Sequence, residues 1–340
     1  MNGYGLGIHA ELFGPEAAVA ASTSAPRNPP ELMIVGGDGS RYRTNEADRR
    51  KGESDTNPAA VSDPPSEAES GPGEPGARER DSGWREEKVG VLARAERGFT
   101  DDSGEWRPPK EIVKTCVATT EGIEAFGRDM RTEAERRGIE RAKEVVFVSD
   151  NGHGMPQMME REFPEAHHVT DYKHASDRLK DSARIVHGEG PGASPAREAM
   201  RHELKALLWD GEVGRVIERL AAEAAEFAPR PAEVSDLAEG TPGRALWAHV
   251  FYFEKWKGSM DYPGYRRRGW PIASSSIESA CGQIGERIKH ARMRWTRRRA
   301  GAMCQVKAAM MSGDGRWERR RPTPIPALDV PALAYPAQAA

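Results

Sequence analysis

The first part of the chain alternates apolar runs with polar stretches, a pattern that predicts short buried strands. Such runs cover residues 32–35, 88–95 and 112–118, and a tract rich in Pro, Gly, Ser and acidic residues lies at 44–82. Successive strands that are joined only by loops pair in an antiparallel fashion. We therefore expect these three runs to form an antiparallel meander from which the tract at 44–82 loops out.

The clearest helical pattern covers residues 121–138. Its apolar side chains recur at spacings of three and four residues, which places them on one helix face: Ile123, Phe126, Met130 and Ala134. Thr120 is expected to cap this helix, and Gly138 to end it in a left-handed conformation. Residues 145–148 follow as an uninterrupted apolar run. That run predicts a strand buried on both faces and, because a helical crossover precedes it, parallel to the first strand.

The second half of the chain changes to a mainly helical pattern. A short helix at 155–162, a strand at 166–170 and a helix at 171–187 are expected first. Residues 194–257 then show apolar positions at helical spacing without a strand signal, which predicts three or four helices. One more helix is expected to open near residue 274, with its apolar face toward the core.

These elements predict an α/β fold with a mixed sheet, flanked by helices and interrupted by an all-helical insertion. Hydrophobic residues make up only 37% of the chain and its mean hydropathy is −0.72, which indicates disordered segments beside a compact core. The expected core parts are 31–190 and 263–321, and the helical insertion is 191–262. The segments expected to be disordered are 1–30, 44–82 and 322–340.

The cysteines and the hydropathy exclude several classes of protein. Cys116, Cys281 and Cys304 are far apart and odd in number, so neither a disulfide framework nor a thiolate zinc site is expected. No apolar run approaches the roughly 18 residues that span a bilayer. The N-terminal residues lack the pattern of a signal peptide. We therefore expect a cytoplasmic protein without a membrane partner.

Three acidic residues stand where a metal-dependent site needs them. Asp38 follows the first apolar run in the sequence GGDG, Asp150 ends the run at 145–148, and Glu278 lies at the start of the last expected helix. Open α/β sheets carry their chemistry at the carboxyl ends of strands. Mg²⁺ prefers oxygen ligands, and two such ions about 3.5 to 4 Å apart suit phosphodiester chemistry. If the first and fourth strands are neighbours, Asp38 and Asp150 lie side by side.

Each of these residues also has an ordinary structural explanation. Asp38 can belong to a hairpin turn, Asp150 can be a turn residue or a helix cap, and Glu278 can form a capping box with the serine three residues before it. Asp171 with His174 can cap the helix that they open. Zinc is disfavoured because three histidines lack metal-ligand spacing with any cysteine: His153, His167 and His168.

Basic residues gather toward the C-terminal end. Residues 264–321 contain fifteen Lys and Arg against four Asp and Glu, a balance of +11 that leaves −14 for the rest of a chain whose total is −3. Arginine triplets alternate there with tryptophans. A solvated face is the ordinary explanation, but this composition suits a polyanion better. The residues expected to contact DNA are Arg266, Arg267, Arg268, Arg287, Lys289, Arg292, Arg294, Trp295, Arg297, Arg298 and Arg299.

Several segments, taken in order, resemble transposases of bacterial insertion sequences. They span residues 31–320 and read GGDGSRYR, GWREEKVGVL, IEAFGRDMRTEAERRGI, VVFVSDNG, FPEAHHVTDYKHASDRL and RRRGWPIASSSIESACGQIGERIKHARMRW. The chain is most similar to the Kra-type group, which is related to the Mutator-like transposases. This resemblance implies a ribonuclease H-like catalytic core with a DDE triad.

The resemblance also implies a role for individual residues. Asp38, Asp150 and Glu278 would be the catalytic triad and would hold Mg²⁺ or Mn²⁺, as two ions. Asp171 and His174 match an element that helps to position DNA near the cleaved bond. Such a family binds terminal inverted repeats and target DNA, assembles as a homo-oligomer on DNA, and is associated with the nucleoid. It hydrolyses a phosphodiester and then uses the freed 3′-hydroxyl to attack target DNA.

Two other functions stay open at this point. A truncated, catalytically silent transposase remnant would still bind DNA through the basic region, but its triad would not be assembled. A metal-dependent DNA nuclease or resolvase on the same fold would cut DNA without strand transfer. Convergence of the three carboxylates separates the silent remnant from the two enzymes, and strand-transfer products separate the enzymes from each other.

Overall fold

The computed structural model describes residues 29–43 and 84–320, apart from residues 153, 191, 193, 290–292 and 294. The three segments expected to be disordered lie outside this part of the chain, except for residues 29 and 30. In the described part, every helix is too short or too polar to cross a membrane. Cys116, Cys281 and Cys304 are all buried and free, in agreement with the expectation from sequence.

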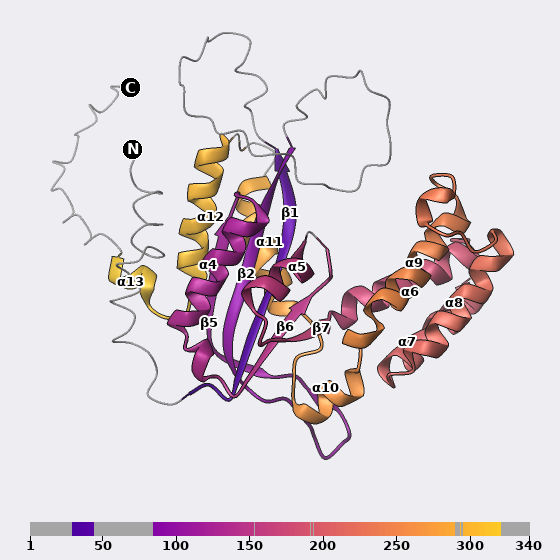
Figure 1. The fold of residues 1–340 in the computed structure, drawn as a ribbon, viewed down its shortest axis with the longest axis horizontal. Helices are drawn as coiled ribbons and strands as arrows, with labels where there is room; N and C mark the ends of the chain where they lie inside the picture. The colour runs from indigo at the N-terminus through magenta and orange to yellow at the C-terminus, as the bar shows by residue number, and fades with distance from the viewer. Residues whose placement is uncertain are drawn as a thin grey trace, which may run out of the picture.

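A five-stranded mixed sheet lies at the centre of the molecule (Figure 1). β2 runs antiparallel to β1 and to β5, whereas β6 is parallel to β1 and β7 is parallel to β6. The predicted α/β class, the meander and the parallel fourth strand are therefore confirmed. The strand order is β5-β2-β1-β6-β7, with bounds Lys110–Thr119, Trp84–Glu96, Leu32–Arg43, Glu144–Ser149 and His167–Thr170.

A small ribbon was not expected from the pattern. β3 (Phe99–Thr100) and β4 (Trp106–Arg107) pair with each other in the loop between β2 and β5. Each strand has only two residues, which is too short for an alternation of apolar and polar positions to be recognised.

The first strand is longer than its apolar run indicates. β1 continues through the GGDG sequence at 36–39, which pairs with β2 along its whole length. A Cβ atom on Gly36 would lie 2.2 Å from Ile277 Cδ1 and 2.5 Å from the carbonyl oxygen of Val148. Gly36 therefore permits a helix to approach the sheet closely, and the hairpin-turn interpretation of Asp38 is wrong.

Helices cover both faces of the sheet (Figure 1). One face packs against α4 (Ile123–Arg136) and α5 (Met155–Glu162). The other face packs against α11 (Ser275–Lys289), α12 (Arg297–Met311) and, beyond β6 and β7, α6 (Tyr172–His187). The chain ends its described part with α13 (Arg316–Arg320).

The ends of α4 were predicted in part. Gly138 has a φ of 81° and supplies the left-handed residue after the helix, as expected. The residue before the helix is Gly122, which makes no capping hydrogen bond through a side chain, so the prediction of Thr120 as the cap is wrong. Tertiary packing of Phe126 and Met130 stabilises this helix without a cap.

The helical insertion forms a lobe beside the sheet (Figure 1). Residues 194–257 contain three α-helices, within the predicted three or four, and a short fourth helix follows. Their apolar faces share one core with α6 and with the edge of the sheet near β6 and β7. The helices are α7 (Ser194–Trp209), α8 (Val213–Phe227), α9 (Pro242–Trp256) and α10 (Tyr262–Arg268), with 3-10 turns at Val234–Asp236 and Lys257–Ser259.

Candidate functional site

Asp38 lies within β1, and Asp150 directly follows the end of β6, the parallel strand beside it. β1 and β6 pair in register from Leu32, which lies opposite Glu144. The last pair is Gly36 with Val148, and the same offset along the chain separates Asp38 from Asp150, two residues beyond that pair. Both aspartates are half-buried.

Asp150 begins the turn that follows β6. Its Oδ1 accepts a hydrogen bond of 2.8 Å from the amide of Gly152. Asn151 has a φ of 69°, and its side-chain amide donates a 2.9 Å hydrogen bond to the hydroxyl of Thr170 at the end of β7. The turn therefore ties β6 to β7 and holds Asp150 at the carboxyl edge of the sheet.

α11 crosses β1 on the side of Asp38. Ile277 packs over Gly36, and one turn later the thiol of Cys281 donates a hydrogen bond to Asp38. Burial raises the pKa of the Cys281 thiol, and the negative charge of Asp38 raises it further, so the thiol stays neutral. Glu278 lies one turn before Cys281 on the same helix, which brings the third carboxylate to the same edge of the sheet.

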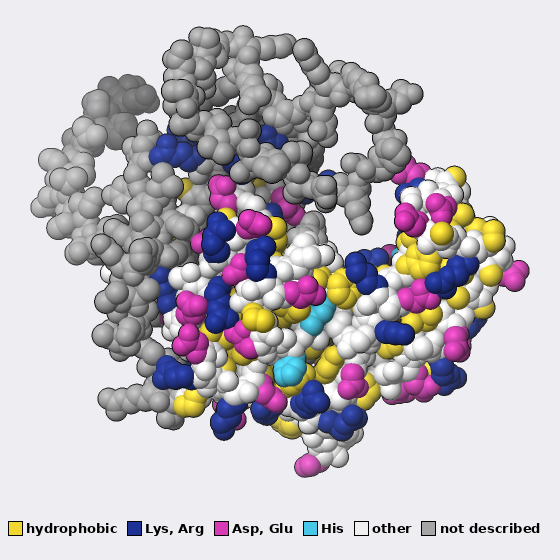
Figure 2. All heavy atoms as spheres, in the orientation of Figure 1, with side chains coloured by type: hydrophobic (Ala, Val, Ile, Leu, Met, Phe, Trp, Pro, Cys, Tyr) yellow, Lys and Arg dark blue, Asp and Glu magenta, His cyan; other side chains and the backbone are white. Residues whose placement is uncertain are grey.

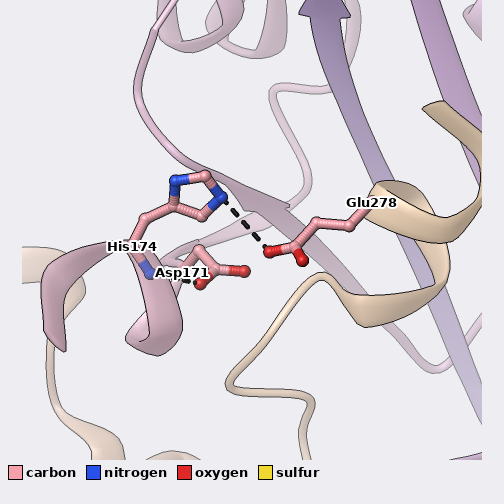
Figure 3. Close-up of side chains that lie close together, drawn as sticks. All are labelled: Asp171, His174 and Glu278. Atoms are coloured by element: carbon pink, nitrogen blue, oxygen red, sulfur yellow. Dashed lines mark hydrogen bonds and ion pairs between the residues drawn. The ribbon is translucent and has the colours of Figure 1, made fainter. Parts of the chain in front are cut away.

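The carboxylate of Glu278 is turned toward the start of α6 (Figure 3). Its Oε1 lies 3.3 Å from His174 Nε2 and 3.5 Å from Lys173 Nζ, although neither group makes an aligned hydrogen bond with it. α11 begins at Ser275, so Glu278 is its fourth residue, and the amides of Ile277 and Glu278 donate to the carbonyl of Ser274. Glu278 therefore does not form the capping box that its spacing allows.

Asp171 joins the two helices that meet at this site. Its side chain is fully buried, and Oδ1 accepts a 2.9 Å hydrogen bond from the amide of His174, which confirms the capping interpretation. Oδ2 accepts hydrogen bonds from both the amide, at 2.6 Å, and the hydroxyl of Ser274, the residue before α11. One carboxylate therefore fixes the start of α6 against the start of α11, and with them His174 against Glu278.

Asp171, His174 and Glu278 form a group that could hold a metal ion. Each offers one ligand atom, and these atoms lie within 4.8 Å of one another. Asp38 and Asp150 are not part of this group. Asp171 already accepts three hydrogen bonds. It therefore connects two helices and is less suited to bind a metal. A donor set with an imidazole suits Mn²⁺ or Zn²⁺ better than Mg²⁺.

Arg178 is a basic residue near this edge that the sequence patterns did not single out. It follows His174 by one helical turn, and its guanidinium carbon lies 4.0 Å from the centroid of the Tyr252 ring. Burial raises the pKa of Tyr252; the positive charge of Arg178 lowers it, and the negative charge of Asp150 raises it. Tyr252 therefore lies within the field of both charges. Among the described residues, no carboxylate lies within 4.0 Å of Arg178. Its position beside Tyr252 depends on the packing of α9, so the sequence pattern does not reveal it.

The fold separates the predicted DNA-binding residues into two groups. Arg266, Arg267 and Arg268 end α10 at the amino edge of the sheet, where the carbonyl of Arg268 accepts a 2.8 Å hydrogen bond from Arg97. Arg266 packs with its guanidinium carbon 3.6 Å from the centroid of the Trp209 ring, which explains it as a structural residue. Arg267 and Arg268 are exposed.

The second group lies near the carboxyl edge. Arg297, Arg298 and Arg299 form the first turn of α12, which Thr296 caps, and Arg297 lies 3.3 Å from Glu121 just after β5. Because β5 runs parallel to β1, this is the edge that carries Asp38 and Asp150.

The remaining residues predicted to contact DNA lie between α10 and α12 in the chain or outside the described residues. Lys289 contacts the hydroxyl of Ser40 at 2.5 Å and lies 3.5 Å from the buried Glu87. The guanidinium carbon of Arg287 lies 5.9 Å from the centroid of the Trp295 ring. Arg292 and Arg294 lie outside the described residues.

In comparisons with known proteins, no protein-family model matches this chain and no curated protein matches it. The function is therefore argued from the geometry of the site.

Proposed function

We propose that the protein is a DDE-type transposase, which cuts DNA at the ends of a mobile element and joins them to a target. The observation that carries the proposal is the parallel pairing of β1 with β6, because Asp38 lies in β1, Asp150 directly follows β6, and α11, which bears Glu278, packs over β1. The strand order β5-β2-β1-β6-β7, in which β2 alone opposes the others, is the order of ribonuclease H-like sheets and supports the same assignment.

Asp38, Asp150 and Glu278 are the residues that would hold the divalent ions in this proposal. Their donors are carboxylate oxygens only, which fits Mg²⁺ or Mn²⁺. When bound, such ions activate the attacking oxygen and neutralise charge at the scissile phosphate. Cys281 orients Asp38 through its hydrogen bond. Lys173 and His174 restrain Glu278, so an ion that Glu278 ligates competes with these two side chains.

The basic side chains on the same edge provide contacts for DNA. The positive end of a helix dipole disfavours cations, yet three arginines occupy the first turn of α12. A bound phosphate backbone explains this placement, because it would offset the repulsion. Arg178 adds a guanidinium on the other side of Asp150, so DNA would cross the carboxylates between α12 and α6.

A cleavage assay tests the proposal. The substrate is a plasmid that carries the DNA flanking the coding sequence, incubated with the protein in Mg²⁺ or Mn²⁺. We expect the wild type to produce nicks and strand-transfer products, and Asp150→Asn to bind the same DNA without cutting it. Asp102→Asn, which changes an exposed acid in the β3–β4 loop, is the matched control and should cut normally.

The outcomes separate the three candidate functions. Wild-type protein that binds the flanking DNA but never cuts it in either metal would contradict the catalytic proposal and leave a silent DNA-binding remnant. Cleavage without joined products would identify a metal-dependent nuclease or resolvase instead.

A further inference from the structure

A cavity lies at the amino edge of the sheet, where the helical insertion meets β7. It has a volume of about 520 Å³ and is lined by residues from the start of β7, the end of α9, the turn after it and α10. Figure 2 shows Lys and Arg side chains gathered on the surface at this end of the molecule, around α10. The cavity is separate from the carboxylates, because Asp38 and Asp150 lie at the opposite edge of the sheet.

Two cations in the lining are held against tryptophan rings. Lys255 Nζ lies 4.9 Å from the centroid of the Trp256 ring, and the guanidinium carbon of Arg268 lies 4.7 Å from that of Trp270. Trp270 is itself fixed, since only 1% of it is exposed and its indole N–H donates a 2.7 Å hydrogen bond to Glu144. These contacts restrict both cations before a ligand arrives, which reduces the entropy lost on binding.

The nearby carboxylates are engaged elsewhere. Arg97 and the Trp270 indole both bond to Glu144, at 2.5 and 2.7 Å. The carboxylate of Asp261 accepts a 3.0 Å hydrogen bond from the amide of Gly264. Among the described residues, neither Lys255 nor Arg268 has a carboxylate within salt-bridge distance. The lining therefore carries two cations that make no salt bridge, together with the carboxylate of Asp261.

Both histidines of the lining pack against tryptophan rings. Burial lowers the pKa of His168 to about 4, so this ring is neutral at physiological pH and adds no charge. His167 stacks on Trp270 with ring centroids 4.6 Å apart, on a ring that Arg268 also covers. Because Trp270 is occupied in this way, the lining offers charge rather than a free ring on which a nucleobase could stack.

We propose that this cavity binds a phosphoryl group between Lys255 and Arg268. Both side chains are cations, and phosphate oxygens are their preferred partners among biological anions. The phosphoryl group belongs either to a DNA strand that reaches the amino edge or to free phosphate. Phosphate binding at this cavity does not require DNA cleavage, so binding can be tested without a cleavage assay.

Titration calorimetry with inorganic phosphate tests the proposal on the full chain. Lys255→Gln and Arg268→Gln should each weaken phosphate binding by roughly tenfold, because each removes one charge-assisted contact. Lys257→Gln and Arg128→Gln change exposed residues that do not line the cavity, so they should leave the affinity unchanged. Thermal unfolding of all four variants confirms that they are folded.

A second arm identifies the source of the phosphoryl group. Fluorescence anisotropy of a labelled single-stranded oligonucleotide is measured with the same variants, with and without competing phosphate. Loss of oligonucleotide binding in both cavity variants would assign the site to DNA, and loss of phosphate binding alone would assign it to free phosphate. Wild-type phosphate affinity in both cavity variants, or equal loss in the controls, would overturn the proposal. Asp150→Asn should bind phosphate normally, which separates this test from that of the catalytic site.

Discussion

Both edges of the sheet contain arginines that the sequence presents as similar triplets. At the carboxyl edge, Arg297–Arg299 begin α12, where the helix dipole opposes them. At the amino edge, Arg266–Arg268 end α10, where the dipole favours them and tryptophans pack against two of them. The two triplets therefore differ in how the helix dipole acts on them, and Arg297 is also paired with Glu121 at 3.3 Å.

The two edges also differ in how their acidic residues are hydrogen-bonded. Glu144 at the amino edge is engaged by Arg97 and Trp270, and despite burial these hydrogen bonds lower its pKa. At the carboxyl edge, Glu278 Oε1 lies near Lys173 and His174 but makes no aligned hydrogen bond. The first acid is a structural residue, whereas the second retains the capacity to bind a ligand.

The largest effect is expected from Asp38→Asn. Cleavage should fall by roughly 10³-fold, because ions that activate and neutralise the reacting groups contribute several kcal/mol. DNA affinity, measured by anisotropy, should change little. Arg268→Gln at the other edge should leave single-turnover cleavage intact, and equal losses in the two variants would contradict the separation of the edges.

Gly36→Ala should destabilise the protein by roughly 3 kcal/mol, because the added methyl group overlaps Ile277 and the backbone carbonyl of Val148. Urea denaturation followed by circular dichroism measures the loss. Gly122→Ala is the control, since a Cβ there meets no atom within 4 Å. A Gly36→Ala protein as stable as this control would show that α11 does not depend on close approach to the sheet.

Asp171→Ala should cost roughly 2 kcal/mol of stability, because it leaves buried amide and hydroxyl groups of Ser274 and His174 without an acceptor. Cleavage should fall as well, since Glu278 loses its fixed position. Asp177→Ala removes an exposed carboxylate from the same helix and should be nearly neutral. Asp171→Ala with wild-type stability and activity would rule out this role for the carboxylate.

Acid should destabilise the protein partly through His168. Its pKa is about 4 in the folded state, below its ordinary value of 6.5, so the unfolded chain takes up the proton first as the pH falls. The contribution of neutral His168 to the free energy of unfolding is complete above pH 6.5. It decreases by about 1.4 kcal/mol per pH unit between pH 6.5 and 4. His168→Gln should remove it and flatten the stability profile over that window, whereas the exposed His167→Gln should not.

The smallest effect is expected from Lys173→Gln. In the proposed site this exposed cation would compete with a metal for Glu278, so its removal should lower the Mn²⁺ concentration needed for half-maximal cleavage by roughly twofold to fivefold. Lys180→Gln, an exposed change farther along α6, is the control. A higher metal requirement in Lys173→Gln would show that the lysine orients Glu278 for the metal instead of competing with it.

The sequence alone predicted the main strands and helices and the direction of the strands, although it missed the β3–β4 ribbon. The apolar run at 145–148 specified β6, because a strand buried on both faces needs no polar alternation, and the helix before it made β6 parallel to β1. The two strands are neighbours, and the close approach of Asp38 to Asp150 stays a prediction.

Only the tertiary structure decided what each polar residue contacts. The GGDG sequence has the composition of a turn, yet it continues a strand because Ile277, far along the chain, packs on Gly36. Glu278 has the spacing of a capping box, yet it contacts Lys173 and His174 because Asp171 holds the two helices together. A local sequence pattern indicates which contacts a residue is able to make. The contacts that form depend on which distant segments pack beside it, and that follows from the whole buried core.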